Sequence, residues 1–363
     1  MHSLPVQKTI PEAGYPRLST ARNVLGQVLK FGLAAAVVVY LIFHGDIAWD
    51  PLRAALGEWQ YTLPAFSILA LTPLGQFWRW QSLLRSGGLL LPHREVFSCL
   101  MVSKFFNMAF PGYVSGDILR GFYVFRRAAE DGDPGTETGA APVKAGPQTV
   151  VASIVVDRAA GLLPLFVLSL AGLMGAIWRP LPARLVWSVG LVAGIGLAGM
   201  LSLFLFAFWF ASPPAILVRL TRLVRCDQAI SYLHEVTHVY VRNLKLIAHI
   251  LGISFITQGA GLASFVLFGL ALKVQIPLSA YLMLAPLGLM VTAIPVTPAG
   301  LGVGQVAFLS LFHMAGSSQG ANLYTLYAAS YVLINLSGAL LYLSSSVSPP
   351  LPQPANPGKI DRE

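Results

Sequence analysis

The chain has 363 residues, of which 55% are hydrophobic and only 11% are charged, with a mean hydropathy of +0.68. Soluble domains carry about 25% charged residues, so this composition excludes a soluble protein and predicts an all-α membrane protein. The net charge of +9 comes from Lys and Arg clusters that flank apolar runs, a pattern of membrane orientation and not of nucleic-acid binding.

The apolar runs predict a polytopic bundle of about eight transmembrane helices, because a helix needs about 20 apolar residues to cross the hydrocarbon layer. The predicted spans are residues 25–44, 60–78, 151–178, 185–210, 246–272, 278–294, 300–316 and 322–346. They form one transmembrane domain over 25–346, between a basic N-terminal arm (1–24) and a short polar tail (347–363). Basic residues concentrate on the cytoplasmic side, so we expect both termini there and the protein in the plasma (inner) membrane.

The segment at 95–119 is apolar enough to enter the membrane, yet basic clusters flank it on both sides. A full crossing would place the second cluster outside. A re-entrant hairpin that turns at Pro111 and Gly112, in "AFPGYVSGD", keeps both clusters in the cytoplasm. The sequence therefore predicts a hairpin here, with Gly116 just after its turn.

Two stretches are predicted to lie outside the hydrocarbon layer on the cytoplasmic side. Residues 128–149 are acidic and rich in Gly and Pro, which is typical of a flexible loop. Residues 213–243 begin "SPPAILVRLTRLVR", with apolar residues at helical spacing and arginines between them. This pattern fits an interfacial helix on anionic lipid headgroups, or an ordinary connecting helix.

A second break occurs in "AIPVTPAGLGVGQVAF" (293–308), where Pro295, Pro298, Gly300 and Gly302 interrupt an apolar stretch. Irregular backbone at membrane depth survives only where protein or a water-filled cavity covers it. Paired breaks in the two halves of a transporter point to a central substrate site. Residues 278–316 can form either two full spans or a second re-entrant hairpin. Both arrangements leave the C-terminus on the same side.

Four charged residues follow the first break: Asp117, Arg120, Asp157 and Arg158. Asp117 and Arg120 are three residues apart, so they share a helix face and can pair. Ionisable residues in a membrane usually face a cavity or a partner. Arginine forks bind phosphate and carboxylates bind a headgroup amine, so the four can form a lipid-headgroup site. The alternative is an ion-pair network that fixes the hairpin, or a helix cap by Ser115 and Asp117.

Two further polar residues occur in apolar segments, and we expect structural roles for both. Lys104 precedes the first break and could meet phosphate, but we expect it instead to extend its ammonium toward the membrane interface. Gln258 lies within the fifth predicted span, where an amide usually forms an interhelical hydrogen bond.

Three phrases, in the order "FNMAFPGYVSGDILRGFYVFRR", "DRAAG" and "PVTPAGLGVGQVAFL", resemble the lysylphosphatidylglycerol synthase transmembrane-region family. The resemblance covers about residues 28–346. It implies a helical bundle with re-entrant segments that moves lipids between leaflets. The family motifs fall on Pro111, Gly112, Gly116, Asp117 and Arg120, on Asp157, Arg158 and Gly161, and on Pro298, Gly300, Leu301, Gly302 and Val303.

One residue departs from the family pattern. Family members typically carry a glutamate shortly after the last glycine run, and this chain has Gln305. A neutral amide can bond a headgroup but cannot balance a cation. We therefore expect Asp117, Arg120, Asp157, Arg158 and Gln305 to bind an anionic or zwitterionic lipid, either a phospholipid, aminoacylated or not, or a polyprenyl-phosphate-linked lipid.

The expected partners are membrane lipids and no nucleic acid, with no cofactor. We expect a transporter and not an enzyme, because no segment resembles the soluble aminoacyl-transferring domain of lysylphosphatidylglycerol synthases. A separate lipid-modifying enzyme would have to supply that chemistry. No Gly-x-x-x-x-Gly-Lys-Ser/Thr motif occurs, so ATP hydrolysis is not expected to drive transport.

Two other classes of function stay open. "HEVTH" places His234, Glu235 and His238 at the spacing of a zinc metalloprotease. A catalytic zinc needs a third protein ligand, which here would have to be His249 or His313, so we expect no metal. A non-transporting scaffold subunit is the third class.

Overall fold

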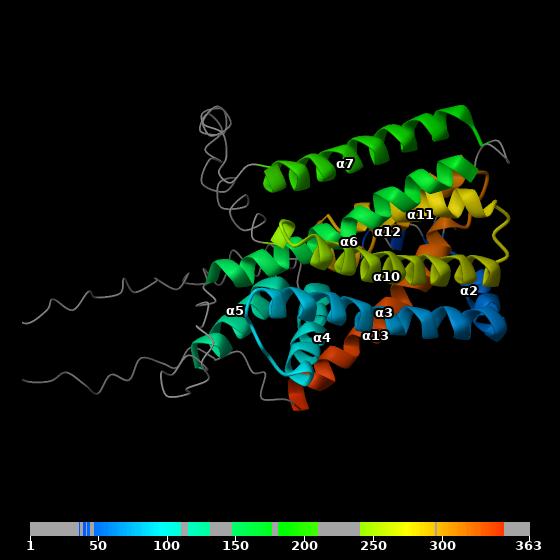
Figure 1. Ribbon diagram of the computed structural model, residues 1–363. Helices are drawn as coiled ribbons and strands as arrows, with labels where there is room; N and C mark the ends of the chain where they lie inside the picture. The colour runs from blue at the N-terminus through cyan, green and yellow to red at the C-terminus, as the bar shows by residue number, and fades with distance from the viewer. Residues whose placement is uncertain are drawn as a thin grey trace, which may run out of the picture.

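The computed structural model describes residues 36, 39–40, 42–43, 47–109, 115–130, 147–175, 181–209, 240–294 and 296–344. Within these ranges the chain is helical and contains no strand, which confirms the predicted all-α class (Figure 1). The helices are α2 (Trp49–Gly57), α3 (Trp59–Ser86), α4 (His93–Ala109), α5 (Ser115–Glu130), α6 (Pro147–Gly175), α7 (Ala183–Trp209), α10 (Leu244–Ala271), α11 (Leu278–Thr292), the 3₁₀ turn η1 (Pro298–Gly300), α12 (Val303–Met314) and α13 (Gly320–Ser344).

Four of the described helices are both long enough and apolar enough to cross a membrane, namely α6, α7, α10 and α13. Helix α3 has 28 residues, but it carries the polar residues Gln76, Arg79 and Gln81. Arg79 and Gln81 are buried inside the bundle, where polar side chains in a membrane find partners. The predicted spans at 60–78, 151–178, 185–210, 246–272 and 322–346 therefore correspond to α3, α6, α7, α10 and α13. The span at 25–44 lies mostly outside the described residues.

Helix α7 lies at the outside of the bundle, alongside α6 (Figure 1). Its outward side chains are large and apolar, with Trp187, Leu191, Ile195 and Trp209 all exposed. In a membrane this face meets lipid. Of the four membrane-crossing helices, α7 is the least buried and also the most apolar, as expected of a helix that exposes its side chains to lipid.

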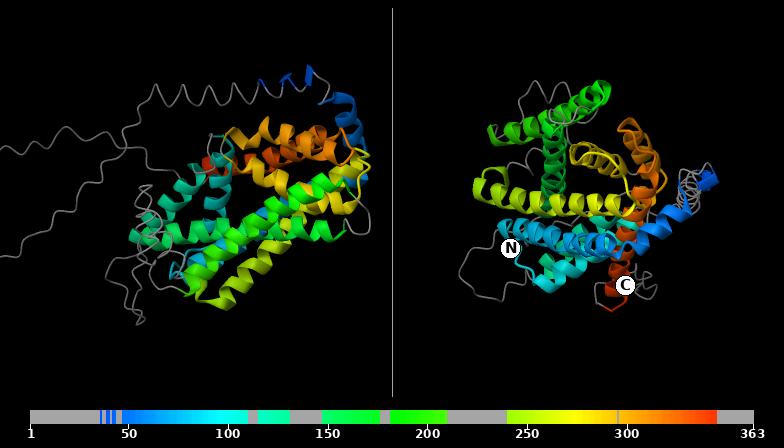
Figure 2. Two further views of the ribbon diagram at one scale, coloured as in Figure 1. Left: turned by 90° about the horizontal axis from the view of Figure 1, so that it is seen from above. Right: turned by 90° about the vertical axis from the view of Figure 1, so that its right-hand side faces the viewer.

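Two pairs of short helices complete the bundle, α4 with α5 and α11 with α12. Their lengths are 17, 16, 15 and 12 residues, or roughly 18 to 26 Å at 1.5 Å per residue. The hydrocarbon layer is about 30 Å thick, so we interpret both pairs as re-entrant hairpins. They lie toward opposite ends of the long axis of the bundle (Figures 1 and 2). The predicted spans at 278–294 and 300–316 thus become the arms of the second hairpin.

Close helix contacts at glycine hold each hairpin in place. In the first hairpin, a Cβ on Gly116 would collide with the carbonyl oxygen of Ser103 on α4. For the second, a Cβ on Gly172 of α6 would collide with the backbone at Met283 of α11, where Ser169 Oγ donates a hydrogen bond to Met283 O at 2.8 Å. Small residues at helix interfaces permit this approach in membranes.

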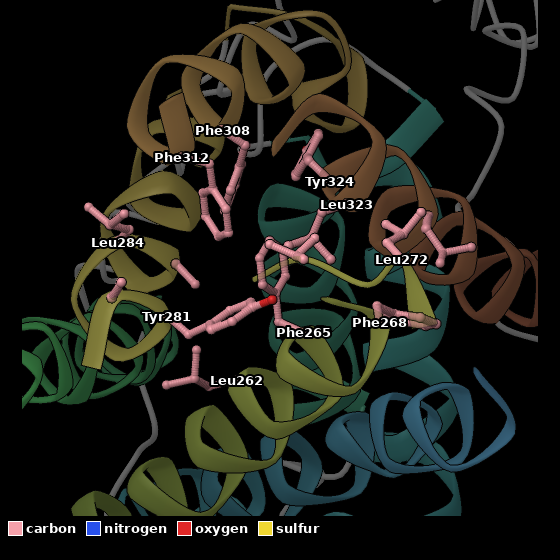
Figure 3. Packing of buried hydrophobic residues seen from close by; sticks show 14 of the residues in the cluster. Leu262, Phe265, Phe268, Leu272, Tyr281, Leu284, Phe308, Phe312, Leu323 and Tyr324 are labelled. Atoms are coloured by element: carbon pink, nitrogen blue, oxygen red, sulfur yellow. The ribbon is translucent and has the colours of Figure 1, made fainter. Parts of the chain in front are cut away.

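An aromatic cluster anchors the second hairpin to α10 and α13 (Figure 3). Phe308 of α12 stacks on Tyr324 of α13, with ring centroids 5.0 Å apart and an interplanar angle of 12°. Phe265 of α10 lies 4.8 Å from Phe308, and Tyr281 of α11 meets Phe312 at 5.6 Å. Lipid tails are as apolar as these rings, so packing contacts, and not transfer from water, stabilise the cluster.

Candidate functional site

A cavity of about 510 Å³ lies between the described parts of the two hairpins. The first hairpin lines it with Lys104 and Asn107 from the last turns of α4 and with residues of the first turns of α5. The second hairpin contributes Thr292 at the end of α11 and Ala299 of η1. Residues of α3, α6, α10 and α13 close the sides. The helix ends that flank the first break and the turn of the second break therefore line one cavity, as expected of irregular backbone in a membrane.

The cavity lies near the middle of the long helices. On α6, which runs from Pro147 to Gly175, the lining residues extend from Asp157 to Leu165. Gln258, which also lines the cavity, lies midway along α10. The polar cavity therefore lies at mid-length of α6 and α10.

Asp157 of α6 is the centre of a buried ion-pair network. Its Oδ1 accepts a hydrogen bond from Arg79 Nε at 2.6 Å, and its Oδ2 accepts from Arg120 Nη1 and Nη2 at 3.2 and 3.3 Å. All three side chains are less than a tenth exposed. The network joins α3, α5 and α6. Arg79 Nη1 extends it to α10 by donating to Ser254 Oγ at 3.1 Å.

Asp117 forms the second half of the network, nearer the surface. Arg158 of α6 donates from Nε to Asp117 Oδ2 at 2.8 Å, and its Nη2 lies 2.7 Å from the same oxygen. Arg120 Nε is 3.1 Å from Asp117 Oδ1, close enough to pair although the angle is outside that of a hydrogen bond. The Arg158 side chain is 44% exposed and the Asp117 side chain 15%. The predicted pairing of Asp117 with Arg120 is thus present, and Arg158 joins it.

Packing contacts, in addition to ion pairs, position the guanidinium groups of Arg120 and Arg79. The Arg120 guanidinium carbon lies 4.9 Å from the centre of the Trp80 ring, a cation–π contact. A Cβ on Gly161 would lie only 3.2 Å from Arg79 Nη1, so a glycine makes room for this guanidinium. Gln258 Nε2 donates to Gly161 O at 2.8 Å, the interhelical role expected of it.

Lys104 is buried in the cavity wall, so its expected extension toward the interface is wrong. Only 8% of the residue is exposed. Its Nζ donates to Gln76 Oε1 at 2.8 Å and lies 5.2 Å from the centre of the Tyr331 ring. A sequence signal exists: Ser103, Lys104 and Asn107 share one face of α4, whose second half is otherwise apolar, and all three line the cavity.

The model of the family described as lysylphosphatidylglycerol synthase TM region matches residues 27–338. The chain belongs to this family. No curated protein matches the sequence closely enough to count as a relative. The matched range contains both hairpins and the described residues that line the cavity.

The motif residues of the lysylphosphatidylglycerol synthase transmembrane-region family fall into two groups in this structure. Asp117, Arg120, Asp157 and Arg158 meet at the cavity, as predicted. Gly116 donates its backbone N–H to Asn107 Oδ1 at 2.8 Å and lies at the hairpin tip. Pro111, Gly112 and Pro295 lie outside the described residues.

Gln305, at the position where family members typically have a glutamate, does not line the cavity with the four charged residues. Its Oε1 accepts a hydrogen bond from Gly302 N at 2.6 Å, and its Nε2 lies 3.5 Å from Thr325 Oγ1. The residue is 2% exposed. The structure therefore places Gln305 as the cap of α12, which it closes by bonding the residue before the helix.

The second break itself contains left-handed backbone. Ala299 has a φ of 51°, Gly300 of 69° and Gly302 of 80°. Glycine adopts such angles at little cost, whereas alanine does so at a strain of about 1–3 kcal/mol. The Tyr324 hydroxyl lies 3.3 Å from Ala299 O and 3.4 Å from Gly300 O, and donates to this turn. Pro298 is buried beside it.

The alternative zinc motif, His234, Glu235 and His238, lies outside the described residues. Among the residues the structure does describe, no group of three or more His, Cys, Asp or Glu side chains could hold a metal ion.

Proposed function

We propose that this protein is an integral membrane flippase that moves an anionic or zwitterionic lipid between leaflets. The observation that carries the proposal is the charged cavity between the two hairpin tips, at mid-depth in the bundle. A charged headgroup enters hydrocarbon only at a large free-energy cost. A cavity with guanidinium and ammonium groups replaces the lost water with hydrogen-bond donors and lowers that cost.

The two hairpins supply a physical route for the headgroup. They lie toward opposite ends of the bundle (Figure 2), and both line the cavity, so we expect each to separate it from one interface. Movement of one hairpin tip at a time would open the cavity to one leaflet while the other tip stays closed, as in alternating access. The acyl chains would remain in the bilayer throughout. Without a nucleotide-binding loop, transport would run downhill or be coupled to an ion through Asp117 or Asp157.

Reconstitution in liposomes tests the proposal directly. Fluorescent lipids are placed in both leaflets, and a membrane-impermeant reductant bleaches those that reach the outer leaflet. We expect the wild type to expose the inner pool, and Arg158→Ala to lose most of this activity because Arg158 lines the cavity. Arg184→Ala removes an exposed arginine from α7 and should behave as wild type.

The absence of any protein-dependent movement, across a panel of headgroups, would overturn the flippase proposal. If deletion of the protein instead disrupted a membrane complex, a scaffold subunit would be the better description. A stoichiometric zinc ion that is lost on His234→Ala would favour the protease alternative.

We also propose that the protein lies in the plasma membrane with both termini in the cytoplasm. The support is the basic residues at both ends of the first hairpin, with Arg85 before it, Arg94 in its first turn, and Arg126 and Arg127 near its end. A single cysteine at Glu130, in a variant without the native cysteines, should resist impermeant reagents in intact cells. Labelling from outside would reverse the orientation.

A further inference from the structure

The two carboxylates in the cavity are fully occupied by arginines. Asp157 Oδ1 pairs with Arg79 and its Oδ2 with Arg120. Asp117 Oδ1 pairs with Arg120 and its Oδ2 with Arg158. All four carboxylate oxygens therefore face a guanidinium, and a headgroup amine would have to displace an arginine to reach one.

The cavity wall has an excess of positive charge. Among the described side chains that line it, those charged at neutral pH are Arg79, Lys104, Asp117, Arg120, Asp157 and Arg158. Four are cations and two are anions, so the lining carries a formal charge of +2. Charges in a poorly solvated site act strongly on one another and on a ligand. A cationic headgroup is repelled here and an anionic one is attracted.

Lys104 is the cation with no acidic partner in the described part of the chain. Its contacts are the neutral Gln76 amide and Tyr331. An ammonium has three N–H donors, and a buried cation is stable only when paired and hydrogen-bonded. Tyr331 interacts electrostatically with both Lys104 and Arg158, and all three side chains line the cavity. An anion bound between them would supply the missing counter-charge.

We propose that the cavity selects lipids whose headgroup is an anionic phosphate ester, with Lys104 as the residue that determines this specificity, and that it discriminates against aminoacylated, cationic headgroups. This inference rests on the proposed flippase function. Lysine binds phosphate as a compact point charge, and Arg158 adds a planar fork beside it. A lysyl-phosphatidylglycerol headgroup adds two ammonium groups to one phosphate and brings a net positive charge into a positive cavity.

Matched reporter lipids in liposomes test the selection without any variant. Phosphatidylglycerol and lysyl-phosphatidylglycerol that carry the same fluorescent acyl chain are compared for protein-dependent movement. We expect phosphatidylglycerol to move about tenfold faster or more, because one charge-assisted hydrogen bond made or lost corresponds to at least that factor. Equal rates, or faster movement of the lysyl lipid, would overturn the charge selection while the flippase function stands.

Variants at Lys104 then assign the selection to this residue. Lys104→Gln should slow phosphatidylglycerol about tenfold and narrow its advantage over the lysyl lipid, and Lys104→Arg should restore most of the difference. Lys245→Gln makes the same chemical change at an exposed position on α10 and should leave both rates unchanged. An unaltered lipid preference in folded Lys104→Gln would remove Lys104 from the proposal.

Binding to detergent-purified protein decides the inference if no lipid moves. Phosphatidylglycerol should raise the melting temperature of the wild type more than lysyl-phosphatidylglycerol does, and this difference should shrink in Lys104→Gln. Glycerol 3-phosphate tests for a soluble ligand. Equal stabilisation by glycerol 3-phosphate and phosphatidylglycerol would show a site for free phosphate esters and overturn the lipid assignment. If the protein bound phosphatidylglycerol selectively but moved no lipid, the transport proposal would be rejected and the lipid selectivity would stand.

Discussion

The two re-entrant hairpins share a geometry but differ in chemistry. The first brings Lys104, Asp117 and Arg120 to the cavity. The second, from Leu278 to Met314, contains no Asp, Glu, Lys or Arg at all. It contributes apolar side chains, Thr292 and the strained turn at Ala299. The charges that would hold a ligand thus come from one hairpin and the long helices, while the other hairpin supplies a neutral wall.

The second arms of the two hairpins nevertheless begin in a similar way. In the first, Asn107 Oδ1 accepts from the backbone N–H of Gly116 at 2.8 Å. In the second, Gln305 Oε1 accepts from the N–H of Gly302 at 2.6 Å. Each tip therefore uses a side-chain amide to satisfy a glycine N–H at the start of its second arm, where a helix leaves N–H groups unpaired. The two hairpins thus share an amide–glycine hydrogen bond, whereas only the first hairpin carries charged residues to the cavity.

Asp157→Asn should have the largest effect on stability, because it removes the counter-charge of two buried arginines. Breaking a buried ion pair costs about 3–5 kcal/mol in the free energy of unfolding. We expect a large fall in the melting temperature of the purified protein. Asp50→Asn makes the same change at an exposed site on α2 and should cost much less. Similar melting temperatures for the two variants would show that the network does not hold the first hairpin to α3 and α6.

Gly116→Ala tests the closure of the first hairpin tip. The added methyl collides with the backbone of α4 at Ser103, which cannot move aside as a flexible side chain can. We expect a loss of about 1–3 kcal/mol in the free energy of unfolding. Gly252→Ala on α10 meets nothing within 4 Å and should be neutral or slightly stabilising, because alanine favours a helix. Melting curves of the two variants should therefore shift in opposite directions, and a parallel shift would contradict the contact.

Gln305→Ala should have the smallest effect of the three, about 1 kcal/mol, the usual value of a helix cap. This variant also tests whether Gln305 takes part in lipid selection. Because Gln305 does not line the cavity, the ratio of lipid movement between phosphatidylglycerol and lysyl-phosphatidylglycerol should match that of the wild type. A changed ratio with unchanged stability would return Gln305 to the binding site and weaken the contrast between the hairpins.

Much of the fold could be predicted because its signals are local. Apolar runs predict the bounds of α6, α7, α10, α11, α12 and α13 within a few residues, and the three-residue spacing of Asp117 and Arg120 predicts their pairing. Helix length also decides between the two arrangements of 278–316, but only once the ends of α11 and α12 are known.

The composition of the site was harder to predict because it depends on which helices meet. Arg79 looks like one of the basic residues that mark a cytoplasmic helix end, yet it is buried against Asp157, 78 positions away in the sequence. Lys104 has the same ambiguity, since a lysine within an apolar run can reach either an interface or a cavity. Gln305 was misplaced for the opposite reason: its partner is only three residues away, at Gly302.

The outward face of α7 indicates how the molecule is positioned in the membrane. Trp187 and Trp209, 79% and 78% exposed, lie near its two ends. They are 22 residues apart in the sequence, or about 33 Å along a helix axis. Tryptophan is enriched in belts at the two membrane interfaces, and this separation matches the hydrocarbon thickness of a bilayer. The least buried of the four membrane-crossing helices therefore indicates where the two interfaces lie along the bundle.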